Sequence, residues 1–296
     1  MPFRKQLMLF EDHRDMLADS VRMNAYASAI EGVVKPGDRV VDLGAGLGIL
    51  GFMALRAGAA HVDAIEQTDS IELAKRLAER NGFADRMTFH RANSKDVELS
   101  EPADVLLSET LGSFGVEENT LDFFADARRL LKPEGRMLPR ALRLWLVPVE
   151  QQEPRLDFWR DVAGFDFSPA LDELSSRMST TTVAIEDFLA LPQVYQDIDL
   201  RTNDRRELSN TLLFRVLRAG RIHGVAGWFQ VNLCPVVAFS TGPDSAPTHW
   251  KQAFFPLRQP IEVRAGDHFE ATLRLGPKGT RSDDTRVDLS VRCTQI

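Results

Sequence analysis

Hydrophobic and polar residues follow two different patterns on either side of residue 139. From Val40 to Leu138, short apolar runs alternate with segments that carry one apolar stripe at helical spacing. This alternation predicts a parallel, doubly wound sheet with helices on its faces. The expected strands are 40–43, 61–66, 87–89 and 105–107, and the expected helices are 49–57, 70–81 and one that follows Asn119 as its N-cap and buries Leu121, Phe124, Ala125 and Leu131.

After Pro139 the pattern is typical of β-strands separated by short turns. Residues 211–233 predict two strands that turn at Ala219-Gly220, and residues 261–275 repeat this arrangement. Residues 154–192, which contain three prolines, are expected to be helical. The last strand alternates strictly, with these apolar residues on one face: Val287, Leu289, Val291 and Cys293. We therefore expect two domains, an α/β domain over 1–139 and a mostly β domain over 140–296 that forms a sandwich or barrel.

The composition is that of an ordinary globular protein, with 44% hydrophobic and 27% charged residues among 296. No apolar run approaches the ~18 residues that cross a bilayer, so no membrane partner is expected. Two cysteines, Cys234 and Cys293, are too few for a disulfide framework or a Cys-based zinc site and indicate a reducing compartment, the cytoplasm. No metal is expected, because these histidines lack metal-ligand spacing: His61, His90, His223 and His268.

The net charge of -7 is concentrated in the first half, where residues 1–139 hold 17 Lys and Arg against 23 Asp and Glu. Proteins that bind nucleic acid usually present a basic stripe, so nucleic acid is not expected as a partner. An acidic first half suits a cationic substrate better.

A glycine loop, Gly44-Ala45-Gly46-Leu47-Gly48, joins the first expected strand to its helix. Glycines at such a junction let a backbone approach a ligand closely beside a helix N-terminus. Glu66 ends the next strand, where a carboxylate can accept both hydroxyls of a ribose. The loop fits a cofactor with a ribose, an amino-acid tail and no phosphate, which describes S-adenosylmethionine. The alternative is a glycine turn with a structural role alone.

An acidic loop, Ser108 to Glu118, follows the fourth expected strand. Since ligands of doubly wound sheets bind at the carboxyl ends of the strands, this loop is expected to overhang the cofactor. Glu109 and Glu118 could form a pocket for a guanidinium, which pairs with carboxylates in a bidentate manner. The alternative is a pair of solvated surface acids.

With these motifs the sequence resembles the protein arginine N-methyltransferase family over nearly the whole chain. The double-E loop of that family has two glutamates nine residues apart, which Glu109 and Glu118 match, and its Thr-His-Trp motif matches residues 248–250. The resemblance implies a Rossmann-like domain followed by a β-barrel domain. It also implies a homodimer, with residues 167–200 in the place of the helical dimerisation arm of the family.

The resemblance also implies a role for each matching residue. In the first helix of the family, a His, a substrate-contacting Met, an Asp and an Arg have the spacings of His13, Met16, Asp19 and Arg22. Arg22 would hold the methionyl carboxylate of S-adenosylmethionine. The complete cofactor site implied in this way consists of Arg22, Asp42, Gly44, Gly46, Gly48, Glu66 and Ser94.

The implied acceptor site contains the two glutamates, which would grip a guanidinium during in-line methyl transfer that leaves S-adenosylhomocysteine. His249, paired with Asp19, would position the acceptor or take a proton, and Met16 and Trp250 would contact it. Arginine in a cationic protein or peptide is the acceptor that the resemblance favours.

Three departures from the family pattern keep other acceptors open. Residues 3–7 lack the two tyrosines of the family's N-terminal motif, Thr110-Leu111 replace a Trp-Met pair, and Lys95 stands beside Ser94 where the family has an adenine-contacting acid. N- or O-methylation of a free amino acid or another small metabolite is therefore the first alternative. A catalytically silent dimer that binds the cofactor or a partner is the second.

Overall fold

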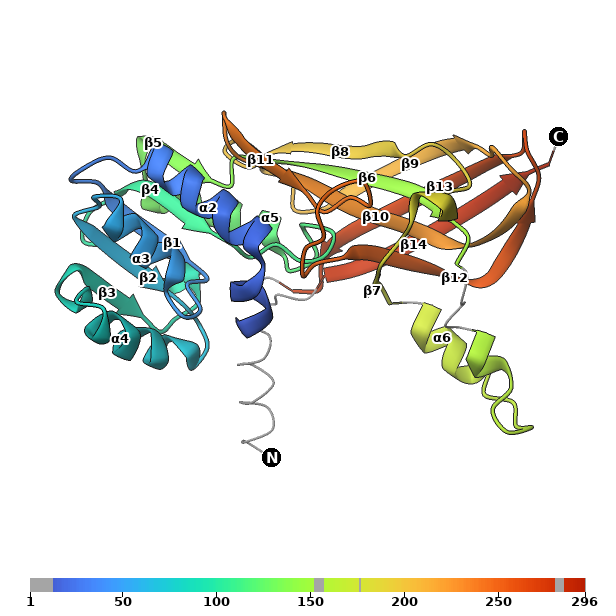
Figure 1. Ribbon diagram of the computed structural model, residues 1–296, viewed down its shortest axis with the longest axis horizontal. Coiled ribbons are helices and arrows are strands. Elements are labelled where there is room, and N and C mark those ends of the chain that lie inside the picture. Colours follow the sequence, from blue (N-terminus) through green and yellow to red (C-terminus); the bar gives the residue numbers. More distant parts are fainter. Residues whose placement is uncertain (1–12, 152–156, 176, 280–284, 296) are drawn as a thin grey trace.

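The computed structural model describes residues 13–151, 157–175, 177–279 and 285–295. It is elongated, with a parallel sheet and its helices at one end and antiparallel strands at the other (Figure 1). The fold class is therefore α/β followed by antiparallel β, as the pattern predicts. No helix in the described ranges is long and apolar enough to cross a membrane.

The parallel sheet has the strand order β3-β2-β1-β4-β5, and every neighbouring pair in it is parallel. Its strands are β1 (Arg39–Leu43), β2 (His61–Ile65), β3 (Met87–His90), β4 (Ala103–Ser108) and β5 (Leu131–Leu138). The helices are α2 (Ser20–Val33), α3 (Ile49–Arg56), α4 (Ser70–Arg80) and α5 (Thr120–Ala127). Helix α4 buries the predicted stripe of Ile71, Ala74 and Ala78. This half is Rossmann-like, as the alternation of strands and helices predicts.

The helix after Asn119 is shorter than the sequence predicts. Leu121 and Phe124 are buried as expected, but Leu131 belongs to β5 rather than to α5. Pro133 cannot donate a helical hydrogen bond, so the chain cannot continue as a helix there. Asn119 holds the N-cap position with a left-handed backbone, and its side chain makes no capping hydrogen bond.

The antiparallel strands form two sheets. One has the order β7-β12-β10-β6-β8 with β11 paired to β10, and the other has the order β14-β13-β9. The strands of the first sheet are β6 (Ala141–Val149), β7 (Ser179–Thr181), β8 (Gln193–Asp199), β10 (Gly220–Cys234), β11 (Val237–Ser240) and β12 (Gln252–Val263). Those of the second are β9 (Leu208–Arg215), β13 (His268–Pro277) and β14 (Thr285–Thr294). A closed barrel and a domain boundary after residue 139 stay predictions.

Both predicted hairpins contain the expected strands but not the expected pairing. Strand β9 pairs with β13, whereas β10 pairs with β6 and β12, so the turn at Ala219-Gly220 crosses from one sheet to the other. The same holds for β12 and β13 around Gly266. Both sheets contribute residues to one core, such as Phe214 and Val225. Two consecutive strands that lie in facing sheets each bury one face against the shared core. Their alternation of apolar and polar residues is then the same as in a hairpin, so the sequence pattern does not distinguish the two arrangements.

The prediction of a helical segment over 154–192 is largely wrong. Within its described part, α6 (Pro169–Ser175) is the only α-helix, accompanied by the 3-10 turns η4 (Asp157–Arg160) and η5 (Ile185–Asp187) and by β7. Ala163 and Gly164, which lie between η4 and α6, both have left-handed backbone conformations, so a right-handed helix cannot continue from η4 to α6. Strand β8 also falls within the arm predicted over 167–200. Helix α6 nevertheless projects from the antiparallel sheets (Figure 1).

Helix α2 joins the two halves of the molecule, because it packs on α3 and also on β10 and β11. Residues 13–18 before it are also helical, but the helical conformation is interrupted at Asp19, which is the N-cap of α2. The larger of two hydrophobic clusters in the described residues runs from Tyr26 of α2 through the parallel sheet to Leu275 of β13. The loop between β4 and α5 contributes Leu111, Phe114 and Val116 to this core.

Candidate functional site

Three strands of the parallel sheet carry candidate residues at their carboxyl ends. Strand β1 runs into the glycine loop, β2 is followed by Glu66, and β4 is followed by Glu109. The strand order changes direction between β1 and β4. Ligands of open α/β sheets bind at such a switch point, outside the carboxyl ends of the strands. The sheet thus places the two predicted motifs at the expected crevice.

Two positions of the glycine loop, Gly44 and Gly48, favour glycine for different reasons. The amide of Gly44 donates to Ile65 O at 2.9 Å, and a Cβ on Gly44 would lie 2.6 Å from Thr110 Cγ2. Gly48, at the N-cap of α3, has a left-handed backbone with φ 84°, which strongly favours glycine. The amide of Gly46 donates to Glu66 Oε2 at 3.1 Å. The loop and the acid of β2 therefore form one unit at the N-terminus of α3.

A cavity of about 160 Å³, here called the glycine-loop cavity, adjoins this unit; it is lined by Leu43, Gly44, Ile65, Glu66, Gln67, Ala92, Asn93, Ser94, Thr110, Glu118 and Phe123. The Glu66 carboxylate accepts from Gly46 N and from Thr68 N, one bond to each oxygen. Each oxygen keeps a lone pair for a ribose hydroxyl. Ser94 Oγ is buried and has no hydrogen-bond partner, so it can bind a polar ligand atom. These features fit the ribose of S-adenosylmethionine.

Asp42 lies beneath the glycine loop and is almost completely buried. Its Oδ2 accepts from Gly51 N at 2.9 Å, whereas Oδ1 is buried without a partner. Burial raises the pKa of Asp42 from 3.8 to about 7; the negative charge of Glu66 adds to this, and the Gly51 amide and Arg22 oppose it. A cation bound nearby would stabilise the ionised carboxylate.

Replacing Asp42 by Asn is expected to stabilise the protein, measured without added cofactor, at about pH 8. Because the folded state holds the Asp42 proton more tightly than the unfolded state, the free energy of unfolding falls as the pH rises from 3.8 to about 7. Asn keeps the acceptor for Gly51 and carries no charge, so the gain is on the order of 2–4 kcal/mol at high pH and disappears at about pH 4. Thermal denaturation at both pH values measures it. A variant less stable than the parent at about pH 8 would contradict the raised pKa.

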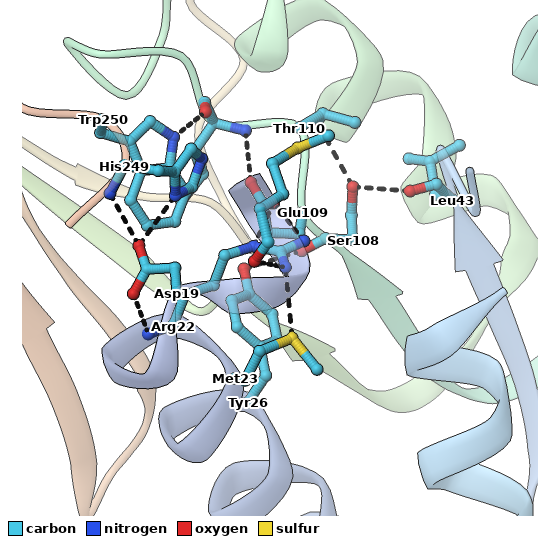
Figure 2. A network of polar contacts seen from close by, with 12 residues as sticks. Asp19, Arg22, Met23, Tyr26, Leu43, Ser108, Glu109, Thr110, His249 and Trp250 are labelled. Carbon is cyan, nitrogen blue, oxygen red and sulfur yellow. Dashed lines mark hydrogen bonds and ion pairs between the residues drawn. The ribbon is translucent and has the colours of Figure 1, made fainter. Parts of the chain in front are cut away.

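Arg22 and Glu109 form a buried ion pair (Figure 2). Arg22 Nε and Nη2 each lie 2.6 Å from Glu109 Oε2, and Nη1 donates to Met16 O at 3.0 Å. Only 7% of the Arg22 side chain and 4% of the Glu109 side chain are exposed. The family resemblance implies that Arg22 binds the cofactor and Glu109 the acceptor. The structure joins the two residues directly.

Asp19 and His249 are brought together across 230 positions of the chain. Asp19 Oδ1 caps α2 by accepting from Arg22 N at 3.0 Å, and Oδ2 accepts from His249 N at 2.9 Å and lies 2.8 Å from His249 Nδ1 (Figure 2). Burial alone raises the pKa of Asp19, but hydrogen bonds from Arg22 and His249 outweigh it and the net pKa is lowered. An ionised Asp19 therefore orients the imidazole of His249.

A second cavity of about 930 Å³, here called the acidic cavity, is lined by Glu109. Its acidic lining residues are Asp15, Asp19, Glu109, Glu117 and Glu118, and its other lining residues include Met16, His249, Trp250 and Lys251. Glu118 is exposed and lines both cavities. Trp250 is only 4% exposed, and its Nε1 donates to Leu111 O at 2.5 Å. It therefore holds the acidic loop in addition to lining the cavity.

Three residues of the site were not among the sequence predictions. Tyr26 donates to Ser108 O at 3.0 Å, and Ser108 Oγ donates to Leu43 O at 2.9 Å (Figure 2). Tyr26 could have been found, because it follows Arg22 by four positions on one face of α2. Ser108 is the last residue of β4, a position typical of ligand-binding residues. Glu117 gives no separate signal, since it stands beside another acid.

The departures from the family pattern lie at defined places. Thr110 lines the glycine-loop cavity and Leu111 lines the acidic cavity. Lys95 forms an ion pair with the buried carboxylate of Asp122, which belongs to α5. Residues 3–7 lie outside the described ranges. No cluster of three or more His, Cys, Asp or Glu residues in the described ranges could hold a metal ion.

The parallel sheet is Rossmann-like, and two cavities that share Glu118 lie at the predicted motifs. Residues 34–157 match a family model described as a methyltransferase domain, and residues 140–295 match one described as the arginine methyltransferase oligomerization subdomain. Protein arginine N-methyltransferase 1 of Schizosaccharomyces pombe is 32% identical over 295 residues, which cover 94% of this chain and 85% of the relative. The chain therefore belongs to the protein arginine N-methyltransferase family, and it is an S-adenosylmethionine-dependent methyltransferase.

Solved structures agree on the fold. The PRMT1 enzyme–prozyme heterotetrameric complex of Trypanosoma brucei with AdoHcy superposes with a TM-score of 0.84 at 24% identity, covering 96% of this chain and 93% of that one. Protein arginine methyltransferase 10 of Arabidopsis thaliana, in an open conformation, gives 0.81 at 26% identity with the same coverage. The arrangement of a parallel sheet followed by antiparallel sheets is therefore shared with this family.

Proposed function

We propose that this protein transfers a methyl group from S-adenosylmethionine to a guanidinium nitrogen, and that the acceptor is arginine in a protein or peptide. The observation that carries this proposal is the position of Glu118, which lines both the glycine-loop cavity and the acidic cavity. A carboxylate there can contact an acceptor beside a bound cofactor. The names of the relatives, protein arginine N-methyltransferases, support the same acceptor.

The acidic cavity suits a delocalised cation. Five acidic residues line it against one lysine, Lys251. Glu109 and Glu118 would bind the guanidinium from two sides, and carboxylates placed in this way draw its positive charge towards the nitrogens that they contact. The remaining nitrogen is then the better nucleophile. Alignment of this nitrogen with the methyl group supplies much of the rate in such a displacement.

The cofactor site follows from the residues of the glycine-loop cavity. S-adenosylmethionine, when bound, supplies an electrophilic methyl group on a sulfonium. Glu66 would accept from its ribose, Ser94 Oγ would bind a polar atom, and Arg22 would hold the methionyl carboxylate. His249, oriented by Asp19, would position the acceptor or accept its proton.

A small guanidine- or amine-bearing metabolite is the second candidate acceptor. One observation favours it: Lys251 lines the same cavity as the clamp, where its ammonium could pair with the carboxylate of a free amino acid. A silent dimer is less well supported, because Glu109, Glu118 and the Asp19–His249 pair are all in place.

The acceptor can be identified by label transfer. Purified protein is incubated with methyl-labelled S-adenosylmethionine and a cell lysate or its small-molecule fraction, with Glu118→Gln as control. Label in methylarginines after acid hydrolysis of the protein fraction would support the proposal and show the degree of methylation. Label confined to small molecules would establish a metabolite methyltransferase. Cofactor binding without any transfer would favour the silent dimer.

We also propose a homodimer in the cytoplasm. Residues 140–295 match a model named for oligomerization, and the projecting segment around α6 exposes Phe158, Phe165 and Phe167. Aromatic side chains gathered on a projecting segment are typical of protein interfaces. Analytical ultracentrifugation of the protein and of a Phe165→Asp variant tests the dimer.

A further inference from the structure

The loop that carries Glu118 is held from inside by its neighbour, Glu117. Glu117 Oε1 accepts from Phe114 N at 2.8 Å, and Oε2 accepts from Phe114 N at 3.0 Å and from Val116 N at 3.2 Å. Buried amides need acceptors, and this carboxylate supplies them. Burial raises the pKa of Glu117, and the loop amides that donate to it oppose the rise. The carboxyl group thus belongs to the interior of the loop.

Gly112 is part of the same arrangement. Its carbonyl accepts from Gly115 N at 2.8 Å, which closes a turn. A Cβ on Gly112 would lie 2.3 Å from Glu117 Oε1, so the carboxylate occupies the space that a side chain would fill. Phe114 is fully buried, with its ring centroid 5.2 Å from that of Phe255. An aromatic ring and a carboxylate therefore fix this turn against the core.

Glu118 lies between two fixed points of the chain. Glu117 precedes it, and on the other side Asn119 is buried, while Thr120 Oγ1 donates to Thr110 O at 2.7 Å. The carboxylate of Glu117 accepts from loop amides and this residue borders only the acidic cavity, whereas Glu118 is exposed and lines both cavities. Since the backbone on both sides of Glu118 is anchored, the direction of its side chain depends on these anchors.

We propose that Glu117 is a positioning residue, whose carboxylate shapes the loop so that Glu118 points into the acidic cavity. This inference rests on the proposed function of Glu118. A carboxylate is needed at position 117, because two oxygens accept from loop amides. An amide side chain of equal size would turn an NH2 group towards one of those N–H donors and lose an acceptor.

The test is Glu117→Gln, with Glu79→Gln on the exposed face of α4 as a matched control. We expect kcat for an arginine-containing peptide to fall about 10- to 100-fold, as for a slightly misplaced catalytic group. The Kd of S-adenosylhomocysteine should stay unchanged, and the control should match the parent protein in both. An unchanged kcat would overturn the proposal.

A double variant tests whether Glu117 acts through Glu118. The Kd of the peptide is measured with S-adenosylhomocysteine present for both single variants and for Glu117→Gln/Glu118→Gln. If Glu117 only positions Glu118, the double variant binds the peptide no more weakly than Glu118→Gln. Additive losses would overturn the proposal. Gly112→Ala, which displaces the Glu117 carboxylate, should reproduce the loss even if Glu117→Gln folds poorly.

Amide hydrogen exchange separates this inference from the proposed function. The amides of Phe114 and Val116 should exchange faster in Glu117→Gln than in the parent protein, and at the parent rate in Glu118→Gln. If the amides of Phe114 and Val116 exchange as slowly in Glu117→Gln as in the parent protein, Glu117 does not hold the loop, whichever acceptor the enzyme uses. If the parent protein methylates no guanidinium acceptor, the proposed function fails, and the exchange rates alone decide on the anchor.

Discussion

Replacement of Glu118 by Gln is expected to reduce methyl transfer about 10²- to 10³-fold, the range seen when one electrostatic group is removed from a preorganised site. Gln has the same size but no charge, so it cannot draw the positive charge of a guanidinium away from the reacting nitrogen. Glu118 lines the glycine-loop cavity from the loop after β4, whereas the ribose-directed Glu66 follows β2 and the glycines precede α3. Cofactor affinity should therefore remain.

The two halves of this expectation are measured separately. Single-turnover label transfer gives the chemical step, and isothermal titration gives the Kd of S-adenosylhomocysteine. Glu98→Gln, at an exposed position, serves as the control. If Glu118→Gln loses cofactor affinity and turnover in equal measure, Glu118 belongs to the cofactor site, and the proposed clamp is wrong.

Much of the fold could be predicted, because local patterns determine it. Strands β1 to β4 of the parallel sheet and helix α4 follow from apolar runs and a helical stripe that short segments already contain, whereas β5 was not predicted. The pairing of β9 with β13 and of β10 with β6 and β12 could not be predicted. These pairings depend on a core shared by two sheets, and a segment of ten residues carries no information about its distant partners.

The candidate site divides in the same way. The glycine loop and Glu66 could be placed from strand and helix alternation alone, since the carboxyl ends of parallel strands meet at one edge. The contact of Asp19 with His249 could be expected only from the family resemblance, because 230 positions separate them. Glu117 stayed hidden, because only the folded loop shows that one of two adjacent acids turns inward.

The ion pair of Arg22 with Glu109 connects the two halves of the proposed site. Arg22 would serve the cofactor carboxylate and Glu109 the acceptor, yet each neutralises the other. A cofactor carboxylate that attracts Arg22 would leave Glu109 more available to a guanidinium. By thermodynamic linkage, the acceptor must then also strengthen cofactor binding by the same factor. The pair therefore offers a physical reason for the two ligands to bind cooperatively.

Replacement of Arg22 by Met is expected to destabilise the protein by about 3–5 kcal/mol, the usual effect of leaving one partner of a buried ion pair without its counter-charge. Glu109 would stay buried beside Tyr26, with the amide of Leu111 as its remaining donor. The same variant should lose most of its affinity for S-adenosylhomocysteine. Thermal denaturation and isothermal titration measure the two effects.

The double variant Arg22→Met/Glu109→Gln separates stability from binding. With the buried charge removed, it should recover most of the stability that Arg22→Met loses, because well-packed neutral groups can replace a buried ion pair. The double variant should still bind S-adenosylhomocysteine weakly, because Arg22 is missing. Glu109→Gln alone should bind it as tightly as the parent protein. An Arg22→Met protein that binds S-adenosylhomocysteine as tightly as the parent would show that Arg22 serves Glu109 and α2, and that another group holds the cofactor carboxylate.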